Sequence, residues 1–406
     1  MSSDDIIKDA GRYLMNTYRR LPLVLTKGRG TRVYDLEGRE YLDFVSGLAV
    51  NNLGHCSPQV TVAFQKQAQR LVHVSNIYYT EPQVTLARML VEHSFADQVF
   101  FCNSGAEANE AAIKLARKYG KEKRDGRFEI ITATQSFHGR TMATITATGQ
   151  EKFWKGFEPL LPGFAYVPYN DLPALEKAIT PKTIAVMMEP IQGEGGVNIP
   201  GGAYLKGLRE ICDAHRILLI LDEVQTGIGR TGTLFAYEQF GMEPDIMTLA
   251  KAIAGGLPMG AMLAKREISE VFVPGTHAST FGGNPLVCSA ALATLKAILE
   301  DGMILDNCRR MGLYLVNGLH EIRKAFPDVV KEVRGLGLMV GMELHGEGGG
   351  IVQACMKAGV LVNCTMDRVL RFLPPLTVSE EEIDVLLKTL RAVLAQASQR
   401  AGEPGG

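Results

Sequence analysis

The sequence has no hydrophobic run long enough to cross a membrane, and it has no excess of charge of either sign. A membrane-spanning helix needs about 20 consecutive apolar residues, and no segment approaches that length. Lysine and arginine together number 43 and aspartate and glutamate 44, so the formal net charge is −1. This balance argues against a broad nucleic-acid-binding surface and against a polybasic membrane patch. The segment Met1–Asp5 is acidic where a secretory signal is basic, so we expect a cytoplasmic protein.

Motifs for metal and dinucleotide binding are also missing. The seven cysteines include no C-x-x-C pair and the eight histidines no H-x-x-x-H pair, which disfavours a disulfide framework and a metal site. The segment 227–232 reads G-x-G-x-x-G, but Asp222 and Glu223 separate it from the preceding apolar run, whereas the dinucleotide motif occupies the first tight turn. Scattered, unpaired cysteines are typical of a reducing compartment.

Short apolar runs alternate with amphipathic segments through the middle of the chain. This alternation predicts an α/β fold, in which helices cover both faces of a mainly parallel sheet. The predicted strands are 98–102, 129–133, 184–188, 217–221 and 246–249, and the predicted helices include 57–71, 104–119, 203–214 and 284–299. A helix over 5–17, two strands at 331–334 and 338–344 and a closing helix over 380–395 are also expected.

The length of 406 residues suggests more than one domain. We expect a large domain over residues 60–300. The segments 1–59 and 301–398 would together build a smaller α+β domain, and residues 399–406 would form a disordered tail.

Polar residues stand at the ends of two predicted strands, where ligands bind in sheets of this kind. Asp222 follows the strand 217–221, and Lys251 follows the strand 246–249. A carboxylate at the end of a buried strand is costly without a cationic partner, and a lysine among apolar residues has its pKa lowered toward the reactive amine. Each residue taken alone is also consistent with a loop cap or a solvated charge.

Two predicted helix starts suit a phosphate group. They are the segments 104–106 and 279–284, which are rich in glycine and hydroxyl side chains. Free backbone N–H groups and the helix dipole favour an anion at such sites. Ser104 and Glu107 also fit a capping box, which by itself explains the first of these starts.

The segment 136–141, SFHGRT, follows the strand 129–133 and offers two further ligand groups. Arg140 is a candidate clamp for a carboxylate, and Phe137 can stack on a planar ring, although both also suit ordinary packing. An acid, a lysine, phosphate-suited helix starts, an aromatic ring and an arginine together meet the needs of a pyridoxal phosphate enzyme.

Eight long motifs follow one another along the chain. In order they are SGLAVNNLGHCSP (46–58), SNIYYTEPQ (75–83), FCNSGAEANEAAIKLARK (101–118), SFHGRT (136–141), EPIQGEGGV (189–197), LDEVQTGIGRTG (221–232), LAKAIAGGLPMGA (249–261) and STFGGNP (279–285). They resemble the motifs of the class-III, fold-type-I pyridoxal phosphate-dependent aminotransferases, and in particular those of the acetylornithine aminotransferase family. The resemblance extends from about Tyr18 to the RFLPPL segment at 371–376.

The resemblance implies a role for each residue at a matching position. Lys251 would bind the cofactor, pyridoxal 5'-phosphate, covalently and move a proton, and Asp222 would pair with the pyridine nitrogen of its ring. The other implied cofactor contacts are Ser104, Gly105 and Ala106 at the phosphate, Phe137 on the ring, Gln225 at the 3-oxygen, the neighbouring Glu223 and Val224, and Thr280 from the partner subunit of a homodimer. The implied substrate contacts are Tyr18, Arg140, Glu194, Ser279 and Arg371.

The implied activity is transfer of the terminal amino group of N2-acetyl-L-ornithine to 2-oxoglutarate, a step of arginine biosynthesis, by a ping-pong route. Arg140 would hold the α-carboxylate of acetylornithine, while Glu194 and Arg371 would form a switch that admits glutamate to the same pocket. Ornithine, succinylornithine, succinyldiaminopimelate and 4-aminobutyrate aminotransferases share this chemistry and stay open as alternatives. A catalytically silent scaffold and an aminomutase of the same fold stay open too, although a silent relative has no need to keep Lys251 and Asp222.

Overall fold

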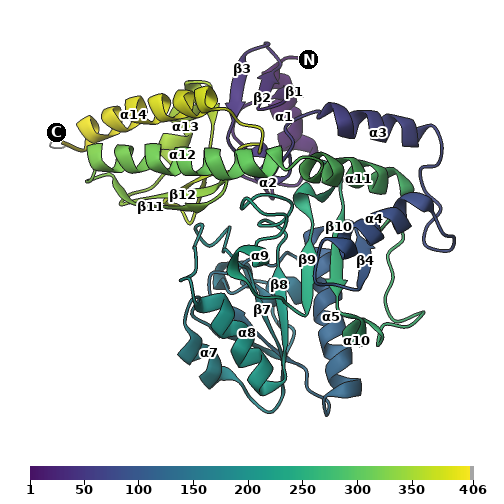
Figure 1. Cartoon of the computed structure of the whole chain (residues 1–406). Coiled ribbons are helices and arrows are strands. Elements are labelled where there is room, and N and C mark those ends of the chain that lie inside the picture. The colour runs from purple at the N-terminus through teal and green to yellow at the C-terminus, as the bar shows by residue number, and fades with distance from the viewer. Residues whose placement is uncertain (403–406) are drawn as a thin grey trace.

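A seven-stranded sheet lies at the centre of the larger part of the molecule (Figure 1). In the computed structural model, which describes residues 1–402 and the side chains of residues 1–396, its strands are β4 (Gln98–Cys102), β5 (Glu129–Ala133), β6 (Phe164–Val167), β7 (Thr183–Met188), β8 (Leu218–Asp222), β9 (Ile246–Leu249) and β10 (Gly260–Ala264). They are ordered β4-β10-β9-β8-β7-β5-β6, and all run in one direction except β10. The predicted α/β fold with a mainly parallel sheet is confirmed, with two strands, β6 and β10, that the sequence patterns did not predict.

Both faces of this sheet are buried, because the residues along each strand alternate between two apolar clusters. Val186 of β7 belongs to a cluster that includes α8 (Tyr204–His215) and α11 (Pro285–Leu299). Its neighbour Met187 belongs to a second cluster, which includes α5 (Gly105–Lys123). Burial on both sides explains why these strands read as continuous apolar runs in the sequence.

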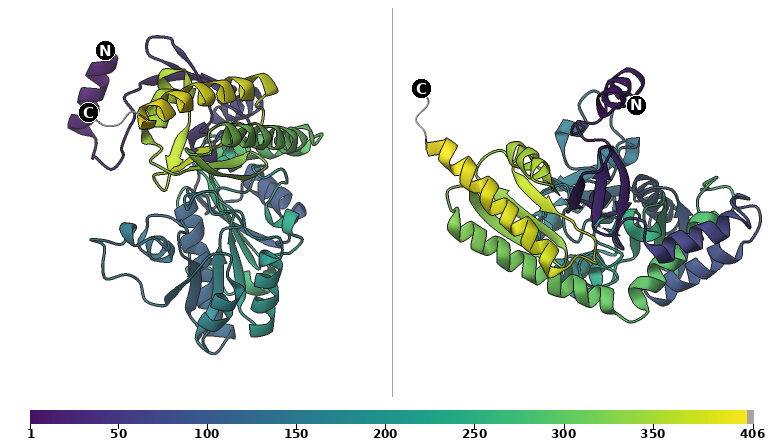
Figure 2. Two further views of the ribbon diagram at one scale, coloured as in Figure 1. Left: turned by 90° about the vertical axis from the view of Figure 1, so that its left-hand side faces the viewer. Right: turned by 90° about the horizontal axis from the view of Figure 1, so that it is seen from above.

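Two smaller sheets form the other part of the molecule. One contains β11 (Val330–Leu336), β12 (Met339–Leu344), β15 (Val369–Phe372) and β14 (Asn363–Thr365) in that order, all antiparallel. The helices beside it are α12 (Met303–Ala325), α13 (Gly349–Lys357) and α14 (Glu380–Gly402), of which α12 and α14 lie side by side (Figure 2). The other sheet contains β1 (Leu25–Arg29), β2 (Arg32–Asp35), β3 (Glu40–Asp43) and β13 (Val360–Leu361). Since β13 pairs with β3, the two terminal segments of the chain share a sheet.

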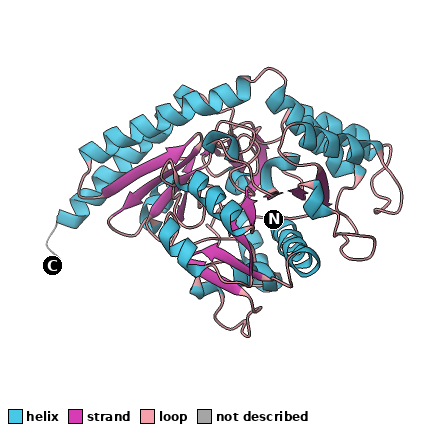
Figure 3. Ribbon diagram, turned by 60° about the horizontal axis from the view of Figure 1, so that its bottom comes forward, coloured by secondary structure: helices cyan, strands magenta, loops and turns pink. Residues whose placement is uncertain are grey.

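The remaining helices surround the sheets, so that strands are enclosed between helices (Figure 3). They are α1 (Ser3–Tyr13), α2 (Ser46–Ala49), α3 (Pro58–Ala68), α4 (Glu81–Glu92), α6 (Met142–Ala147), α7 (Leu172–Ala178), α9 (Tyr237–Phe240), α10 (Arg266–Ser269) and the 3-10 turns η1 (Glu151–Phe153) and η2 (Lys251–Ala254). Helix α1 stands away from the rest of the molecule (Figure 2), and none of its residues is buried. Within residues 1–402, no helix combines the length and apolar character that crossing a bilayer requires.

The chain ends differ most from the sequence-based expectation. Helix α1 ends at Tyr13 rather than at residue 17, because the backbone of Leu14 is already extended. Strands β11 and β12 lie close to the expected positions, but the short strands β13, β14 and β15 were not predicted. Helix α14 continues to Gly402 and so includes the beginning of the segment 399–406, which was expected to be a disordered tail; residues 403–406 lie outside the described residues.

A buried arginine joins the large sheet to the rest of the molecule. Arg230, in the loop after β8, donates to the carbonyl oxygens of Leu338 at 2.9 Å and Pro374 at 2.6 Å, and to the side chain of Asn52 at 2.5 Å. Burial lowers the pKa of Arg230 to about 10. The three acceptors come from both terminal segments, so this one side chain holds those segments against the loop after β8.

Candidate active site

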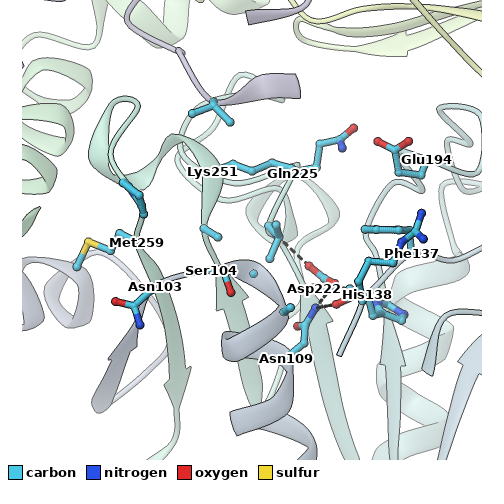
Figure 4. Close-up of a pocket in the computed structure, with 18 of the residues that line it drawn as sticks. Asn103, Ser104, Asn109, Phe137, His138, Glu194, Asp222, Gln225, Lys251 and Met259 are labelled. Carbon is cyan, nitrogen blue, oxygen red and sulfur yellow. Dashed lines mark hydrogen bonds and ion pairs between the residues drawn. The ribbon is translucent and has the colours of Figure 1, made fainter. Parts of the chain in front are cut away.

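A cavity of about 430 Å³ opens at the carboxyl ends of the strands of the large sheet (Figure 4). Its walls are formed by residues that follow β4, β5, β7, β8 and β9, as expected for a sheet of this kind. The volume lies within the usual range of small-molecule sites, roughly 300–1,000 Å³. The lining includes residues 103–106, residues 137–140, Glu189, Glu194, Asp222, Val224, Gln225, Lys251 and Met259.

Asp222 is the last residue of β8 and is almost fully buried at the floor of the cavity. Its Oδ2 atom accepts a hydrogen bond from Asn109 Nδ2 at 2.7 Å and lies 2.8 Å from Nδ1 of His138. Its Oδ1 atom accepts from the backbone N–H of Val224 at 3.0 Å. Thr248 in turn donates to the side-chain oxygen of Asn109. Partners on both oxygens fix the orientation of the carboxylate and stabilise its negative charge.

Lys251 follows β9 directly, and Figure 4 shows its side chain extending toward Gln225. The φ angle of Lys251 is +47°, a left-handed conformation that costs a non-glycine residue about 1–3 kcal/mol and that clusters at functional sites. Burial lowers the pKa of Lys251 below its ordinary value, against the opposing effect of the nearby Glu194 carboxylate. A lysine with a lowered pKa carries more of the neutral amine, which is the form that attacks a carbonyl carbon.

The N-terminus of α5 forms one end of the cavity. Ser104 caps this helix, because its Oγ atom accepts from the backbone N–H of Glu107 at 3.2 Å, as predicted. The carboxylate of Glu107 reaches back to the N–H of Asn103 at 2.7 Å. Gly105 has no room for a side chain, since a Cβ atom there would lie 2.8 Å from Cγ1 of Val224. Residues 104–106 line the cavity, so the start of this long helix suits an anion there.

Phe137 and Arg140 line the wall that follows β5. The guanidinium carbon of Arg140 lies 4.0 Å from the ring centroid of Phe153 and 5.5 Å from that of Phe137, so two aromatic rings hold the charge in place. Arg140 is exposed at the mouth of the cavity, where its planar fork can bind a carboxylate through two hydrogen bonds.

Glu194 and Arg371 form an ion pair, with 2.6 Å between Oε1 and Nη1. Arg371 is fully buried on β15, and it also donates to Oδ1 of Asn363 at 3.0 Å and to Oε1 of Gln225 at 3.2 Å. Its Nη2 atom has no hydrogen-bond partner among the described residues, which is costly for a buried donor. Burial alone would raise the pKa of Glu194, but the charges of Arg371 and Lys251 lower it below its ordinary value.

Five predicted site residues lie outside the described lining of the cavity. One is Arg371, which reaches the lining residues Glu194 and Gln225 through hydrogen bonds. The Glu223 side chain is directed away from it, because its carboxylate accepts from two backbone N–H groups at the start of α9, at 2.7 and 2.8 Å. Tyr18 is 70% exposed and lines a separate surface hollow beside α1. Ser279 and Thr280 precede α11, where Thr280 is exposed to solvent. Ser279 still touches the cavity wall, because its Oγ atom accepts a hydrogen bond from the lining residue Asn103 at 3.2 Å.

Three buried polar residues of the cavity, Asn109, His138 and Glu189, received no role from the sequence. Glu189 accepts from the backbone N–H groups of Phe137 and Gly193, both at 3.1 Å, so it joins two walls of the cavity. Burial raises the pKa of Glu189 to about 7. The one available signal was Asn109, a polar side chain among the alanines on the buried face of α5.

Comparison with known proteins identifies the class of enzyme. The sequence matches the family described as aminotransferase class-III over residues 13–394, which is nearly the whole chain. Two relatives that are more than 50% identical to this chain align with it over almost their full length. The chain therefore belongs to the class-III aminotransferases, and the predicted resemblance is confirmed.

Particular relatives narrow this class. A protein named acetylornithine aminotransferase from Caldanaerobacter subterraneus is 55% identical, in an alignment that covers 95% of this chain and 98% of the relative. Another of the same name, from Methanocaldococcus jannaschii, is 52% identical, and its alignment covers 98% of this chain and 99% of the relative. Among solved structures, ornithine aminotransferase from Toxoplasma gondii has a TM-score of 0.95 at 34% identity, covering 98% of this chain and 96% of its own. N-acetylornithine aminotransferase from Stenotrophomonas maltophilia has a TM-score of 0.83 at 40% identity, covering 97% and 100%.

Proposed function

We propose that this enzyme transfers the terminal amino group of N2-acetyl-L-ornithine to 2-oxoglutarate, forming N-acetyl-L-glutamate 5-semialdehyde and L-glutamate in arginine biosynthesis. Relatives named acetylornithine aminotransferase, 55% and 52% identical, support this choice of substrate. The observation that carries the proposal is the Glu194–Arg371 ion pair, because Glu194 lines the same cavity as Arg140 and Lys251. One arginine in the lining, with a second, neutralised arginine paired to the lining residue Glu194, suits two unlike amino donors.

The residues of the cavity fit pyridoxal 5'-phosphate. The start of α5, with no side chain at Gly105, suits its phosphate. The buried carboxylate of Asp222 suits a cationic ring nitrogen, Phe137 suits a planar ring, and the lowered pKa of Lys251 suits covalent attachment. When bound, the cofactor supplies an aldehyde that captures amines and a ring that accepts electrons from the substrate carbon.

Lys251 and Asp222 have separate tasks in this proposal. Lys251 would hold the cofactor between turnovers and, when freed, move a proton at its Nζ atom, and both tasks require the neutral amine that a lowered pKa provides. Asp222 would stabilise positive charge on the ring nitrogen. Its partners Asn109 and His138 already hold the carboxylate in place, so no reorientation is needed during the reaction.

The two half-reactions make opposite demands on the cavity. In acetylornithine the reacting amine is at the chain end, and the carboxylate is several bonds away, so Arg140 can bind it. In glutamate the reacting amine is next to a carboxylate, which requires a second cation close to Lys251. The Nη2 atom of Arg371, buried and without a partner among the described residues, would bind that carboxylate when Glu194 turns away.

A homodimer is the second part of the proposal. Residues 77–79 are 79%, 68% and 98% exposed although all three are large and apolar or aromatic, and Phe281 is 60% exposed. Asn76 donates to two carbonyls of the segment 279–282, so these exposed side chains lie on neighbouring segments. Exposed apolar patches of this kind mark interaction surfaces. A second copy seated here would bring Thr280 to the cavity of its partner.

Strand pairing and cysteine usage bear on the domain division and on the cellular location of the protein. We propose that residues 60–300 form the large domain and that residues 1–59 and 301–398 form the small one, since these two segments share the sheet of β3 and β13. The proposed location is the cytoplasm, because all seven cysteines are free, as is typical of a reducing compartment.

Ornithine is the alternative donor with a specific observation in its favour. The ornithine aminotransferase from Toxoplasma gondii matches the fold with a TM-score of 0.95, although its identity is only 34%. The two donors differ at the α-nitrogen, which is a neutral amide in acetylornithine and a cation in ornithine. The donor assay below separates them.

Half-reactions measured one at a time test the proposed function. The cofactor-loaded enzyme is mixed with acetylornithine, ornithine, succinylornithine, succinyldiaminopimelate or 4-aminobutyrate, and is then returned to its starting form with 2-oxoglutarate. We expect the highest kcat/KM with acetylornithine, and full turnover only with 2-oxoglutarate. A higher kcat/KM with another donor would contradict the substrate, and turnover without 2-oxoglutarate would indicate an aminomutase. Arg371→Ala should slow the glutamate half-reaction more than the acetylornithine half-reaction, and Glu194→Ala should do the reverse.

A further inference from the structure

The loop that carries Glu194 depends on contacts from outside itself. It follows β7 of the large sheet, and Glu194 is followed by Gly195 and Gly196, the second with a φ angle of +116°. Two successive glycines place little conformational restriction on a backbone. The position of the Glu194 side chain is therefore set by the groups that hold the neighbouring carbonyls.

Those groups come from the opposite edges of the sheet β11-β12-β15-β14. Thr365 of β14 donates from Oγ1 to the carbonyl of Glu194 at 2.5 Å. Arg334 of β11 donates to the carbonyl of Gly196 from Nε at 3.1 Å and from Nη2 at 2.7 Å, and to the carbonyl of Val197 from Nε at 3.0 Å. The loop thus crosses the whole sheet and is tied to both of its edges.

The middle of the sheet is shaped to accept the loop. Gly341 of β12 lacks a side chain, and a Cβ atom there would lie 3.0 Å from Cβ of Val197. Val197 is fully buried and has a φ angle of +55°. A β-branched residue keeps such a strained conformation only where the surrounding contacts impose it. The contacts from Arg334 and from the sheet therefore act as restraints on the loop.

We propose that Arg334 is a positioning residue that sets the choice between amino donors, because it fixes the loop at Gly196 and so keeps Glu194 paired with Arg371. The inference rests on the function proposed above, in which this ion pair favours terminal amines. Glu194 meets Arg371 through one oxygen at 2.6 Å, and its side chain is 29% exposed. A loop released from Arg334 would leave Arg371 unneutralised more often, which favours an α-carboxylate and hence glutamate.

A lysine on the same strand provides a matched control. Arg334 and Lys331 both lie on β11, and both pair with Glu343, at 2.7 and 2.6 Å. The hydrogen bond of Lys331 goes to Glu343, whereas Arg334 also reaches the loop. Lys331→Ala therefore removes a cation and an ion pair from β11 without touching the loop.

The test measures the two half-reactions separately in cofactor-loaded wild type and variants. Arg334→Ala should lower kcat/KM for acetylornithine about tenfold, roughly the effect of one charged hydrogen bond, and change that for glutamate by less than about threefold. Arg334→Lys keeps the charge but not the planar guanidinium, so its kcat/KM for acetylornithine should lie between those of wild type and Arg334→Ala. Lys331→Ala should match wild type in both, and amide hydrogen exchange over residues 194–198 should quicken in Arg334→Ala alone.

A second variant keeps the test decisive if Arg334→Ala does not fold. Thr365→Val removes the other anchor with little change of shape, and it should shift the ratio of the two half-reactions in the same direction. Equal losses in both half-reactions, or equal effects of Arg334→Ala and Lys331→Ala, would overturn the inference and leave the proposed function standing. A wild-type enzyme that reacts with glutamate but not with acetylornithine would instead contradict the proposed function, and the inference with it.

Discussion

The carboxylate of Asp222 is held by Asn109, His138 and a backbone N–H before any ligand arrives. Asp222→Asn preserves the shape of the side chain but removes the charge that would stabilise a cationic ring nitrogen. We expect kcat to fall about 10²–10³-fold, as when one preorganised electrostatic group is lost, while the chain still folds and binds the cofactor. Steady-state kinetics, with circular dichroism as a check on folding, measure this effect.

Asp245 offers a matched control for that substitution. It is also a buried aspartate, but it precedes β9 at the opposite end of the sheet and pairs with Arg209 and Lys265. Asp245→Asn should lower stability and leave kcat close to that of wild type. If Asp222→Asn lost only several-fold in kcat, the role of Asp222 would be structural, and the ring nitrogen would be held in another way.

Glu223 is the neighbour of Asp222 in sequence, yet burial raises its pKa to about 7 from an ordinary value of 4.5. Between these values the folded chain keeps a proton that the unfolded chain has lost, so the contribution of Glu223 to stability is full below pH 4.5 and is lost as the pH rises to about 7. Glu223→Gln does not titrate. It should therefore weaken the fall in unfolding free energy over this pH window, by at most about 3.5 kcal/mol at about 1.4 kcal/mol per pKa unit.

Urea unfolding at pH 5 and pH 8 measures this change. Part of the pH dependence should persist in the variant, because burial also raises the pKa of Glu189 to about 7. An identical pH dependence in Glu223→Gln and wild type would show that Glu223 ionises at its ordinary pKa in the folded chain.

At the scale of the element, the start of α5 must stay free of side chains to hold a phosphate. Gly105→Ala would place a Cβ atom 2.8 Å from Cγ1 of Val224, a residue that lines the cavity and would have to shift. Overpacking of this size costs about 1–3 kcal/mol, so we expect the affinity for pyridoxal 5'-phosphate to fall about tenfold or more. Titration of the cofactor-free enzyme, followed by fluorescence, measures the affinity.

A glycine with open space around it provides a control, because its replacement by alanine creates no close contact. Gly202 precedes α8, and apart from its chain neighbours no described residue has a heavy atom within 4 Å of the place that a Cβ atom would take. Gly202→Ala should therefore bind the cofactor as wild type does. Equal affinity in the Gly105→Ala variant would mean that the helix start does not receive the phosphate.

Sequence patterns predicted an element correctly where the capping residues and the apolar periodicity both indicated it. The Ser104–Glu107 pattern marked the start of α5 correctly, because the Oγ atom meets the backbone N–H three residues later. The segment 80–83, TEPQ, predicts a capping box in the same way. Thr80 nevertheless forms no side-chain cap, and its Oγ1 atom is buried without a partner among the described residues. Strands β6, β10 and β13–β15 were missed, because short strands show no clear periodicity and their pairing partners lie far away in sequence.

Across the whole molecule, sequence reasoning found the site residues that stand at strand ends and missed those that only the fold brings in. Asp222 and Lys251 follow neighbouring strands, so a local rule was enough to place them together. Glu194 and Arg371 are 177 positions apart and come from different sheets, so only the family resemblance indicated their pairing. No local pattern could have joined Arg230 to both terminal segments.

The position of Thr280 predicts how two damaged subunits complement each other. Thr280 is exposed on the segment beside α11, whereas Lys251 lines the cavity of the same chain. In the proposed dimer the two residues of one chain therefore serve different cavities. Lys251→Ala removes the reactive amine, and Thr280→Asp puts a negative charge where the phosphate is expected, so homodimers of either variant should be almost inactive.

A hybrid dimer of these two variants distinguishes the proposed arrangement from its alternative. One of its cavities would contain both substitutions, while the other would combine an unchanged Lys251 from one chain with an unchanged Thr280 from its partner. Coexpression with two affinity tags and sequential purification isolates the hybrid, which should regain about half of the wild-type activity. If both residues served the cavity of their own chain, each cavity would carry one substitution and the hybrid would stay inactive. A dimer of two differently tagged Lys251→Ala chains sets the background, so activity above that level can come only from a cavity built by two subunits.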